Sequence, residues 1–496
     1  MRLCRSDWFF IVAFLLFAAG LRIIGITFGQ PDPKYAPTDE SRQTIHLQTP
    51  LHPDEYFYTA IPVRMLLAGS LNPEFFENPS FLINTNLVTT WVTGAINELS
   101  LSDREDLNLR QYAPFPLYVI GRVYSALGGL LAVAATYGTV RLVAGRFAAS
   151  SAGMLTTVSL PLVQHAHYAT TSSLAAGFVA LSVWASFASL KSTRHRRWLF
   201  PLAGAAAGLA AGNHYNTAAV ALIVVVVGLL LMRRDHSGGV RKVVVAGWLT
   251  IPAVFLLSSP FIVLDFDTFF SQFRDVVGKF TSLNDARFGT PYGLLFEYRY
   301  LVVFGLGIPG VMASLLGLYA AWITRLYHKR FIQYDTTLLL VSILLLYLIV
   351  YSLIVLRTVI PGIGDQLIVP IVPTFAILAG LGMGWLVNHR AFTGALFGPI
   401  LLLALIVQPL SLSVGLVWQF SHADTRELMQ EWIYEHLPPG AHVHLFGAYN
   451  VPLDPARYAS TETLTLDQLE VKTIQYWHNP GLTVYCVTEE SCSAVR

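Results

Sequence analysis

Residues 336–356 read TTLLLVSILLLYLIVYSLIVL, a run without a charged side chain. A helix needs about 20 apolar residues to cross the hydrocarbon layer of a bilayer, so this run predicts a membrane-spanning helix. Ten similar runs accompany it, although the fifth is short. The eleven candidate spans lie near residues 8–28, 116–140, 147–163, 169–190, 199–212, 215–232, 243–262, 299–324, 336–356, 367–386 and 392–418. The chain is therefore expected to be an all-α polytopic membrane protein.

The composition of the whole chain agrees with this class of protein. Of the 496 residues, 54% are hydrophobic and 12% are charged, whereas soluble domains usually carry about a quarter charged residues. This excludes an ordinary cytosolic enzyme, a disordered protein and a disulfide-stapled secreted module. A net charge of +2 gives no case for nucleic-acid binding. Three cysteines are too few for a metal or disulfide framework.

Lysines and arginines set the orientation of the spans, because short cytoplasmic loops collect positive charge. With the N-terminus placed inside, the basic clusters fall in inner loops: Arg141 and Arg146; Lys191, Arg194, Arg196 and Arg197; Arg233, Arg234, Arg241 and Lys242; Arg325, Lys329 and Arg330; and Arg390. The N-terminus is then cytoplasmic and the C-terminus extracytoplasmic, in what we expect to be the plasma membrane. Residues 8–20 could alternatively be the apolar core of a cleavable signal peptide.

The fifth span is the weakest point of this topology. Merging it with the sixth would reverse every downstream segment. Its Gly204, Gly208 and Gly212 recur at a spacing that predicts close packing against another helix.

Four large or polar segments then lie on the outer face, at residues 29–115, 265–297, 357–366 and 421–496. We therefore divide the chain into a transmembrane module, residues 1–420, and a small extracytoplasmic α/β domain, residues 421–496. No Asp or Glu occurs between Asp106 and Asp235, so chemistry that needs a carboxylate belongs to the outer face. An enzyme there lacks cytosolic nucleotide sugars and ATP, and would draw on a lipid-linked donor.

The tail carries signals for a mixed fold. A helix is expected from a cap at Asp424 or Thr425 to Leu437, where Pro438-Pro439-Gly440 ends it. Strands are expected at 443–446 and 482–487. Cys486 and Cys492 could pair in an oxidising compartment, and two free thiols are an equal alternative.

The sharpest local motif is Leu51-His52-Pro53-Asp54-Glu55-Tyr56-Phe57-Tyr58 in the first outer loop. Pro53 favours a helix start and places Asp54 and Glu55 in the first turn. The two acids could simply complement the helix dipole. Alternatively, they are candidate catalytic carboxylates.

Histidines gather in the outer turns. Gln164-His165-Ala166-His167-Tyr168 forms one turn, and Asn213-His214-Tyr215-Asn216 forms another. Together with His52 and Asp54, these histidines could hold a divalent cation, so a divalent cation is a possible cofactor. Interfacial histidines that bond to backbone or headgroups are commoner, so we assign no metal ligand.

Arginines near the outer ends of three spans are candidate phosphate ligands. Arg22, Arg122 and Arg357 either snorkel to the interface or meet an anion. A guanidinium grips phosphate bidentately, so the second reading suits a lipid phosphate. Arg357 is the best of the three, because Pro361, Gly362, Gly364, Asp365 and Gln366 form an irregular turn beside it.

Apolar side chains recur in two outer loops. The first loop contributes Phe75, Phe76, Phe81, Leu82, Leu87, Val88 and Trp91, and the second contributes Phe266, Phe269, Phe270, Phe273, Val277 and Phe280. Both predict interfacial helices that flank the access route of a lipid donor. Simple anchoring of the loops is the alternative.

Taken together, these residues resemble the GT-C superfamily of membrane glycosyltransferases, and within it the bacterial dolichyl-phosphate-mannose protein mannosyltransferase-like proteins. The resemblance rests on motifs in matching order: His52-Pro53-Asp54-Glu55, Gly121-Arg122-Val123-Tyr124-Ser125-Ala126-Leu127, His165-Ala166-His167-Tyr168-Ala169-Thr170-Thr171, Arg357 before Gln366-Leu367-Ile368-Val369-Pro370, and the tail segments Asp424-Thr425-Arg426 and Glu431-Trp432-Ile433. One departure is that Ser172 and Ser173 stand where related sequences often place a second Asp.

The resemblance implies transfer of a sugar from a polyprenyl-phosphate donor to an acceptor hydroxyl, with inversion and with Asp54 as general base. Glu55 and His52 would orient the acceptor or keep Asp54 ionised. Arg357, with Arg122 as second choice, would neutralise the leaving phosphate. Substrate contacts are also expected from His165, His167, His214 and Gln366. The partners are membrane lipids, the lipid donor and a lipid, glycan or protein acceptor.

Two other classes of protein stay open. A lipid or glycan transporter would need midspan charges, which are nearly lacking. A pseudo-enzyme or scaffold is favoured only by the missing second Asp. Neither the sugar nor the acceptor can be read from a motif.

Overall fold

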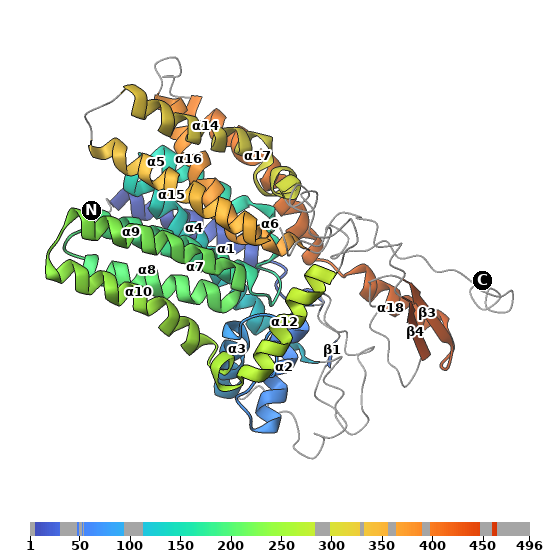
Figure 1. Cartoon of the computed structure of the whole chain (residues 1–496). Helices are drawn as coiled ribbons and strands as arrows, with labels where there is room; N and C mark the ends of the chain where they lie inside the picture. Colours follow the sequence, from blue (N-terminus) through green and yellow to red (C-terminus); the bar gives the residue numbers. More distant parts are fainter. Residues whose placement is uncertain are drawn as a thin grey trace.

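A computed structural model describes residues 5–29, 47–48, 52, 54–93, 113–282, 298–327, 332–355, 364–388, 397–446 and 459–463. Long helices packed side by side form most of this structure (Figure 1). The helices of the bundle are α1 (Arg5–Ile23), α4 (Phe115–Val143), α5 (Arg146–Val158), α6 (Leu160–Gln164), α7 (Ser172–Lys191), α8 (Arg196–Asn213), α9 (Ala221–Arg234), α10 (Gly238–Ser258), α14 (Gly307–Tyr327), α15 (Ile332–Val355), α16 (Val372–Asn388) and α17 (Phe397–Phe420).

Shorter elements join or cover these helices. They are α2 (Glu55–Ala68), α3 (Phe81–Thr93), α11 (Phe261–Leu264), α12 (Phe266–Ser282), α18 (Thr425–His436), the 3₁₀ turns η2 (Tyr215–Val220), η4 (Gly364–Leu367) and η5 (Val369–Ile371), and the π-helical turn η3 (Leu301–Leu306). Two short strands, β1 (Leu47–Gln48) and β2 (Ala113–Pro114), pair antiparallel. Figure 1 shows α2, α3 and α12 at one end of the bundle, with α18 beyond it. We call this the site end.

Among the described residues, eight helical segments are long and apolar enough to cross a membrane. They are Pro116–Val143, Ser172–Lys191, Tyr215–Arg234, Gly238–Ser258, Tyr298–Ile323, Thr336–Val355, Val369–Asn388 and Phe397–Phe420. The other three expected spans also coincide with helices, namely α1, the broken pair α5 and α6, and α8. The protein is thus an all-α polytopic bundle, and the count of eleven spans stays a prediction.

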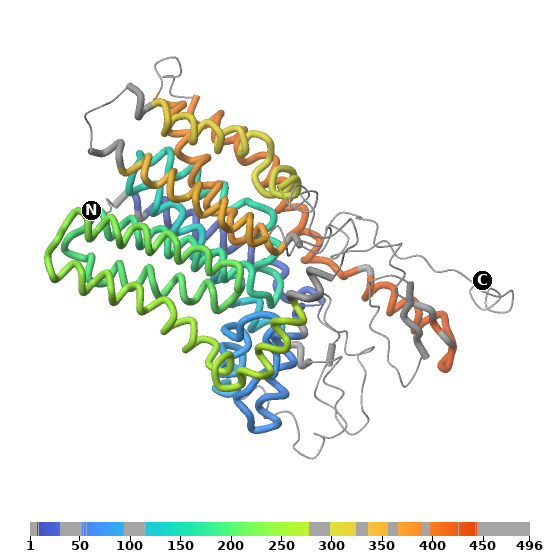
Figure 2. The backbone as a smooth tube through the Cα atoms, in the orientation of Figure 1, coloured from blue at the N-terminus to red at the C-terminus, as the bar shows by residue number. Residues whose placement is uncertain are grey.

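The glycines of the fifth expected span pack as predicted. A Cβ at Gly204 would overlap the carbonyl oxygen of Gly247, and one at Gly208 would lie 2.5 Å from the carbonyl oxygen of Ile251. Both contacts are with α10. The chain leaves α8 at His214, whose φ of −152° and ψ of 122° are extended, and returns as η2 and α9. The fifth and sixth spans are therefore separate helices, and the green tubes of Figure 2 show them side by side in the bundle.

Arg22 differs from its sequence-based interpretation, because it neither snorkels nor lies exposed to a lipid phosphate. Its side chain is 0% exposed. The guanidinium Nη1 donates to the carbonyl oxygens of Ala18 and Thr157, each at 3.1 Å. Helix α5 ends at Val158, so its last carbonyls lack intrahelical partners and carry the negative end of the helix dipole. The cation is thereby stabilised inside the bundle.

The end opposite the site end collects charged side chains. Asp7 of α1 accepts hydrogen bonds from Arg141 and Arg146, each Nε lying 3.0 Å from Oδ1. A further ion pair joins Arg196, at the start of α8, to Asp235, which follows α9, at 3.4 Å. These pairs join the inner loops that the sequence assigns to the cytoplasm.

The expected first and second outer loops pack on each other at the site end. The Asn72 amide donates to Asp265 Oδ2 at 2.7 Å, and the Phe76 backbone N–H donates to Gln272 Oε1 at 2.7 Å. Asn84 Nδ2 donates to the carbonyl oxygen of Ser258 at 2.9 Å. These bonds fix α2 and α3 against α12 and the end of α10.

Only part of the predicted apolar surface is exposed. Phe76 and Leu82 are 0% exposed and belong to the core, which corrects their assignment to the headgroup layer. Trp91 is 73% exposed and Phe266 is 56% exposed. Tertiary packing decides this division, because Leu82 of α3 clusters with Tyr58 of α2 and Phe76 packs on Phe269 of α12.

The tail begins with the expected helix. Asp424 caps α18, and its side chain accepts from the Arg426 backbone N–H at 2.9 Å. The expected strand appears as β3 (His442–Phe446), which pairs in parallel with β4 (Ala459–Thr463), a strand not foreseen. The strand expected at 482–487, Cys486 and Cys492 lie outside the described residues.

Candidate active site

Glu55 is the first residue of α2 and is completely buried. Its Oε1 accepts from Arg122 Nε at 2.8 Å, and its Oε2 accepts from Arg122 Nη2 at 3.1 Å. The backbone N–H of Ala169 donates to Oε1 as well, at 2.8 Å. These three hydrogen bonds compensate the desolvation of a buried carboxylate. Glu55 therefore fixes the start of α2 against α4 and the turn after α6.

Arg122 completes this junction from α4. Its Nη1 donates to the carbonyl oxygens of Ile26 at 3.0 Å and Phe28 at 2.8 Å. The guanidinium also lies 3.9 Å from the centre of the Phe28 ring. With 2% exposure and these donors engaged, Arg122 joins the end of α1 to Glu55.

Asp54 is the N-cap residue of α2, but its side chain makes no capping hydrogen bond. It is only partly buried. Its negative charge acts on Tyr58, whose hydroxyl interacts with the side chains of Thr171 and Asn78. Burial first, and Asp54 second, raise the pKa of Tyr58 above its ordinary value. The buried neighbour Glu55 thus fixes Asp54 at the edge of a polar cluster.

His52 and His165, which come from two different outer segments, lie near each other. The His52 ring centre is 4.3 Å from Tyr168 and 6.5 Å from His165. His52 also receives the Asp54 backbone N–H at Nδ1, at 3.2 Å. His165 is 1% exposed, so its ring belongs to the wall of this cluster.

His167 is held by backbone and by an aromatic stack. Its Nδ1 lies 2.8 Å from the Val163 carbonyl oxygen and its Nε2 lies 3.0 Å from that of Ile24. Phe420 stacks on the ring, with centres 4.5 Å apart. Burial lowers the pKa of His167 to about 4, so the ring is neutral near pH 7. This arrangement favours a structural role over the predicted substrate contact.

The remaining predicted residues lie elsewhere or outside the described residues. His214 stands at the α8–η2 turn, where burial lowers its pKa to about 4. Its neighbour Tyr215 packs on Phe273 of α12, with ring centres 6.0 Å apart. Gln366 is partly exposed in η4. Arg357 lies outside the described residues.

The outer histidines and Asp54 are candidate ligands of a divalent cation. Within the ranges that the structure describes, no three His, Cys, Asp or Glu side chains are grouped so that they could hold a metal ion. His167 is further committed to two backbone carbonyls. The described residues therefore provide no ready metal centre.

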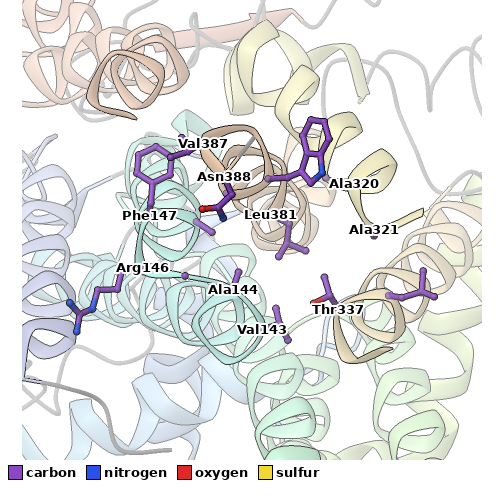
Figure 3. A pocket seen from close by; sticks show the side chains of 16 residues that line it. Val143, Ala144, Arg146, Phe147, Ala320, Ala321, Thr337, Leu381, Val387 and Asn388 are labelled. Atoms are coloured by element: carbon purple, nitrogen blue, oxygen red, sulfur yellow. The ribbon is translucent and has the colours of Figure 1, made fainter. Parts of the chain in front are cut away.

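A pocket lies where α4 ends and α5 begins, beside the end of α16, and Figure 3 shows its lining from close by. Its volume is about 390 Å³, and its lining includes Val143, Arg146, Phe147, Thr337, Leu381 and Trp385. The Arg146 guanidinium pairs with Asp7. Because none of its lining residues belongs to the cluster around Asp54, we do not assign the transfer chemistry to it.

Three members of the cluster were not singled out as site residues from the sequence. Tyr58 follows the acidic pair and Thr171 follows the histidine turn, but nothing in the spacing of the sequence indicates that the two interact. Phe420 lies just beyond the last expected span, 392–418. It packs on Phe28, with ring centres 4.4 Å apart, and so joins the tail to the Arg122 junction.

Solved structures share this architecture. The crystal structure of ArnT from Cupriavidus metallidurans in the apo state has a TM-score of 0.51 and 16% identity, over 95% of this chain and 88% of that one. The crystal structure of the Archaeoglobus fulgidus oligosaccharyltransferase with zinc and sulfate has a TM-score of 0.51 and 15% identity, over 86% of this chain. The chain spans 55% of that archaeal protein's length. No family model and no curated protein matches the chain.

The fold is therefore one that this chain shares with ArnT and with the archaeal oligosaccharyltransferase. Membership of the GT-C superfamily, which the sequence resembles, stays a prediction. At these identities the likeness is one of fold. The narrower resemblance to dolichyl-phosphate-mannose protein mannosyltransferase-like proteins stays a prediction.

Proposed function

We propose that this protein is an integral-membrane glycosyltransferase that uses a polyprenyl-phosphate-linked sugar. The observation that carries the proposal is that the two acids, Asp54 and Glu55, differ in burial and in hydrogen bonding. Glu55 is buried in an ion pair with Arg122, whereas Asp54 beside it is partly exposed and does not cap its helix. A carboxylate held by a rigid neighbour is what a positioned general base requires. The fold shared with ArnT and the archaeal oligosaccharyltransferase supports the same class of enzyme.

The proposed orientation follows from charge. Arg141, Arg146 and Arg196 lie at helix ends opposite the Asp54 cluster. Positive charge in short loops marks the cytoplasmic side. We accordingly propose that the site end and the tail face the extracytoplasmic side of the plasma membrane.

In the proposed reaction, Asp54 accepts the proton of an acceptor hydroxyl. The hydroxyl oxygen forms a bond to the anomeric carbon of the donor sugar, and the bond from that carbon to the phosphate oxygen breaks. The lipid phosphate leaves with the bonding electron pair from the opposite face, so the configuration inverts. Asp54 ends the step protonated.

The surrounding residues receive different proposed roles. Glu55 and Arg122 are positioning residues, because their polar groups are engaged with each other and with backbone. His52 packs on Tyr168 beside Asp54 and is proposed to contact the acceptor. Arg357 stays the proposed partner of the leaving phosphate. A mannosyl donor and a lipid, glycan or protein acceptor are proposed on the sequence resemblance.

Asp54→Asn tests the proposal. Purified protein in detergent is incubated with radiolabelled polyprenyl-phosphate mannose and glucose, and released lipid phosphate and labelled acceptor are counted. Transfer should fall by about 10²–10⁴-fold, while the melting temperature stays at the wild-type value. Asp235→Asn at the opposite end is the matched control and should retain activity. Undiminished transfer by a folded Asp54→Asn protein, or a wild type that releases no lipid phosphate from either donor, would refute the assignment.

A further inference from the structure

The start of α18 lies beside the Arg122 junction although the tail is remote in sequence. Phe420, the last residue of α17, packs on Phe28, His167 and Tyr168, with ring centres 4.4, 4.5 and 5.9 Å away. Phe28 also contacts Arg122 through its ring and its carbonyl oxygen. The short segment after Phe420 leads directly into α18. The tail is therefore anchored where Glu55 fixes α2.

The first turn of α18 is rigid. Arg426 donates to both oxygens of Asp424, with Nε–Oδ1 at 2.7 Å and Nη2–Oδ2 at 2.8 Å. Asp424 is 5% exposed and Arg426 is 2% exposed. Glu427 completes a capping box by accepting the Asp424 backbone N–H at Oε2, at 3.0 Å. This geometry holds the Glu427 carboxyl in place.

The other carboxyl oxygen of Glu427 is buried, and within the described residues it accepts no hydrogen bond. Buried acceptors are normally satisfied, because leaving one unpaired is unfavourable. An unsatisfied carboxyl oxygen on a rigid helix start is thus available to a donor group that arrives from outside the chain. A substrate hydroxyl is such a donor.

The charges around Glu427 connect it to the site. Burial is the main cause that raises its pKa to about 7, and the charge of Asp424 raises it as well. The Asp424 backbone hydrogen bond, Arg426 and Arg122 act in the opposite direction. The effect of Arg122 agrees with the packing of Phe420 on Phe28, which leads the chain into α18 beside the Arg122 junction.

We propose that Glu427 lines the acceptor side of the site, and that its free carboxyl oxygen accepts a hydrogen bond from the acceptor substrate. This inference rests on the proposed glycosyltransferase function. It assigns α18 a part in substrate recognition, whereas the lipid donor is expected to approach from the membrane. The acceptor hydroxyl that bonds Glu427 is distinct from the one that Asp54 deprotonates.

Glu427→Gln tests this role, because glutamine at the same position retains the capping box. Two acceptors are offered, a peptide that contains serine and threonine, and octyl mannoside. The KM for the one that wild type glycosylates is measured at pH 6 and pH 8. At pH 8 the variant should have about a tenfold higher acceptor KM, since it lacks a charged acceptor group. At pH 6 the difference should nearly vanish, because wild-type Glu427 is then mostly protonated. The KM for the lipid donor should not change.

Glu431→Gln, an exposed position on the same helix, is the matched control and should follow the wild type at both pH values. An acceptor KM of Glu427→Gln equal to wild type at pH 8, an equal increase at both pH values, or a change confined to the donor KM would each overturn the inference. These results leave the proposed function standing as long as wild type transfers sugar and Asp54→Asn does not.

Discussion

Arg122 and Glu55 form a bidentate ion pair across 67 residues of sequence, with Nε–Oε1 at 2.8 Å and Nη2–Oε2 at 3.1 Å. Both side chains are almost fully buried. The pair connects α4 to α2, and through Arg122 Nη1 and the Ala169 N–H it also holds the end of α1 and the turn after α6. Glu55 is therefore an anchor, and Asp54 stays the proposed general base of the acidic dipeptide.

Breaking this pair should destabilise the protein. Glu55→Gln leaves a buried guanidinium without its counter-charge, and loss of one partner of a buried pair costs about 3–5 kcal/mol. Thermal unfolding in detergent should show a clear drop in melting temperature. Glu74→Gln, at an exposed position, should unfold like wild type. A Glu55→Gln protein of wild-type stability would contradict the anchoring role.

The contact of α8 with α10 should not tolerate a methyl group. Gly204→Ala places Cβ against the Gly247 carbonyl oxygen, and such overpacking costs about 1–3 kcal/mol. This exceeds the gain of about 1 kcal/mol that alanine brings to a helix interior. Gly239→Ala, where a Cβ meets nothing within 4 Å, should be neutral or stabilising. Equal melting temperatures for the two variants would argue against close packing of α8 on α10.

Buried His167 should make the protein sensitive to acid. Its folded pKa is lowered to about 4, whereas an unfolded histidine titrates near 6.5. Above about pH 6.5 both states are neutral and the group contributes nothing to the pH dependence. Between about pH 6.5 and 4 only the unfolded state binds the proton, so stability should fall by up to about 1.4 kcal/mol per pH unit.

A comparison of melting temperatures from pH 7 to pH 4.5 measures this contribution. His167→Gln removes the titrating group and should show a shallower loss on acidification than wild type. His236→Gln, which alters an exposed histidine, should keep the wild-type slope. If all three slopes agree, His167 does not carry the effect.

Glu427 should lower the stability of the fold as pH rises, whereas His167 lowers it as pH falls. Its folded pKa is raised to about 7, and an unfolded glutamate titrates near 4.3. As pH rises from about 4.3 to 7, the unfolded state releases its proton more readily, so this group makes folding less favourable. Glu427→Gln should therefore gain in melting temperature relative to wild type between pH 5 and pH 8. A constant difference across that range would show that the carboxyl is not desolvated.

Local sequence predicted the elements around the site well. The Pro-Asp-Glu motif indicated that a helix begins at Asp54 and Glu55, and α2 begins at Glu55. Asp424 was expected to cap the tail helix, and it does. These features depend on residues within one turn of each other, so their chemistry is visible in a short window of sequence.

Arg22 shows what a short window of sequence could not predict. Arg22 was expected to snorkel or bind a phosphate, because its own neighbours in the chain are apolar. In the fold it reaches the carbonyl oxygens of Thr156 and Thr157 at the end of α5. The need for a donor arises more than a hundred residues away, where a helix ends, and no periodicity around Arg22 records it.

The sequence by itself determined the class of protein, the positions of the apolar helices and the presence of an acidic pair at a helix start, because hydropathy and capping act over a few turns. Only the tertiary structure decided that Glu55 is buried in an ion pair with Arg122 while Asp54 beside it is partly buried, and that Phe420 packs on Phe28 next to Arg122. Those relationships depend on which helix faces pack together. Such packing is set by shape and by the pairing of buried polar groups across the whole bundle.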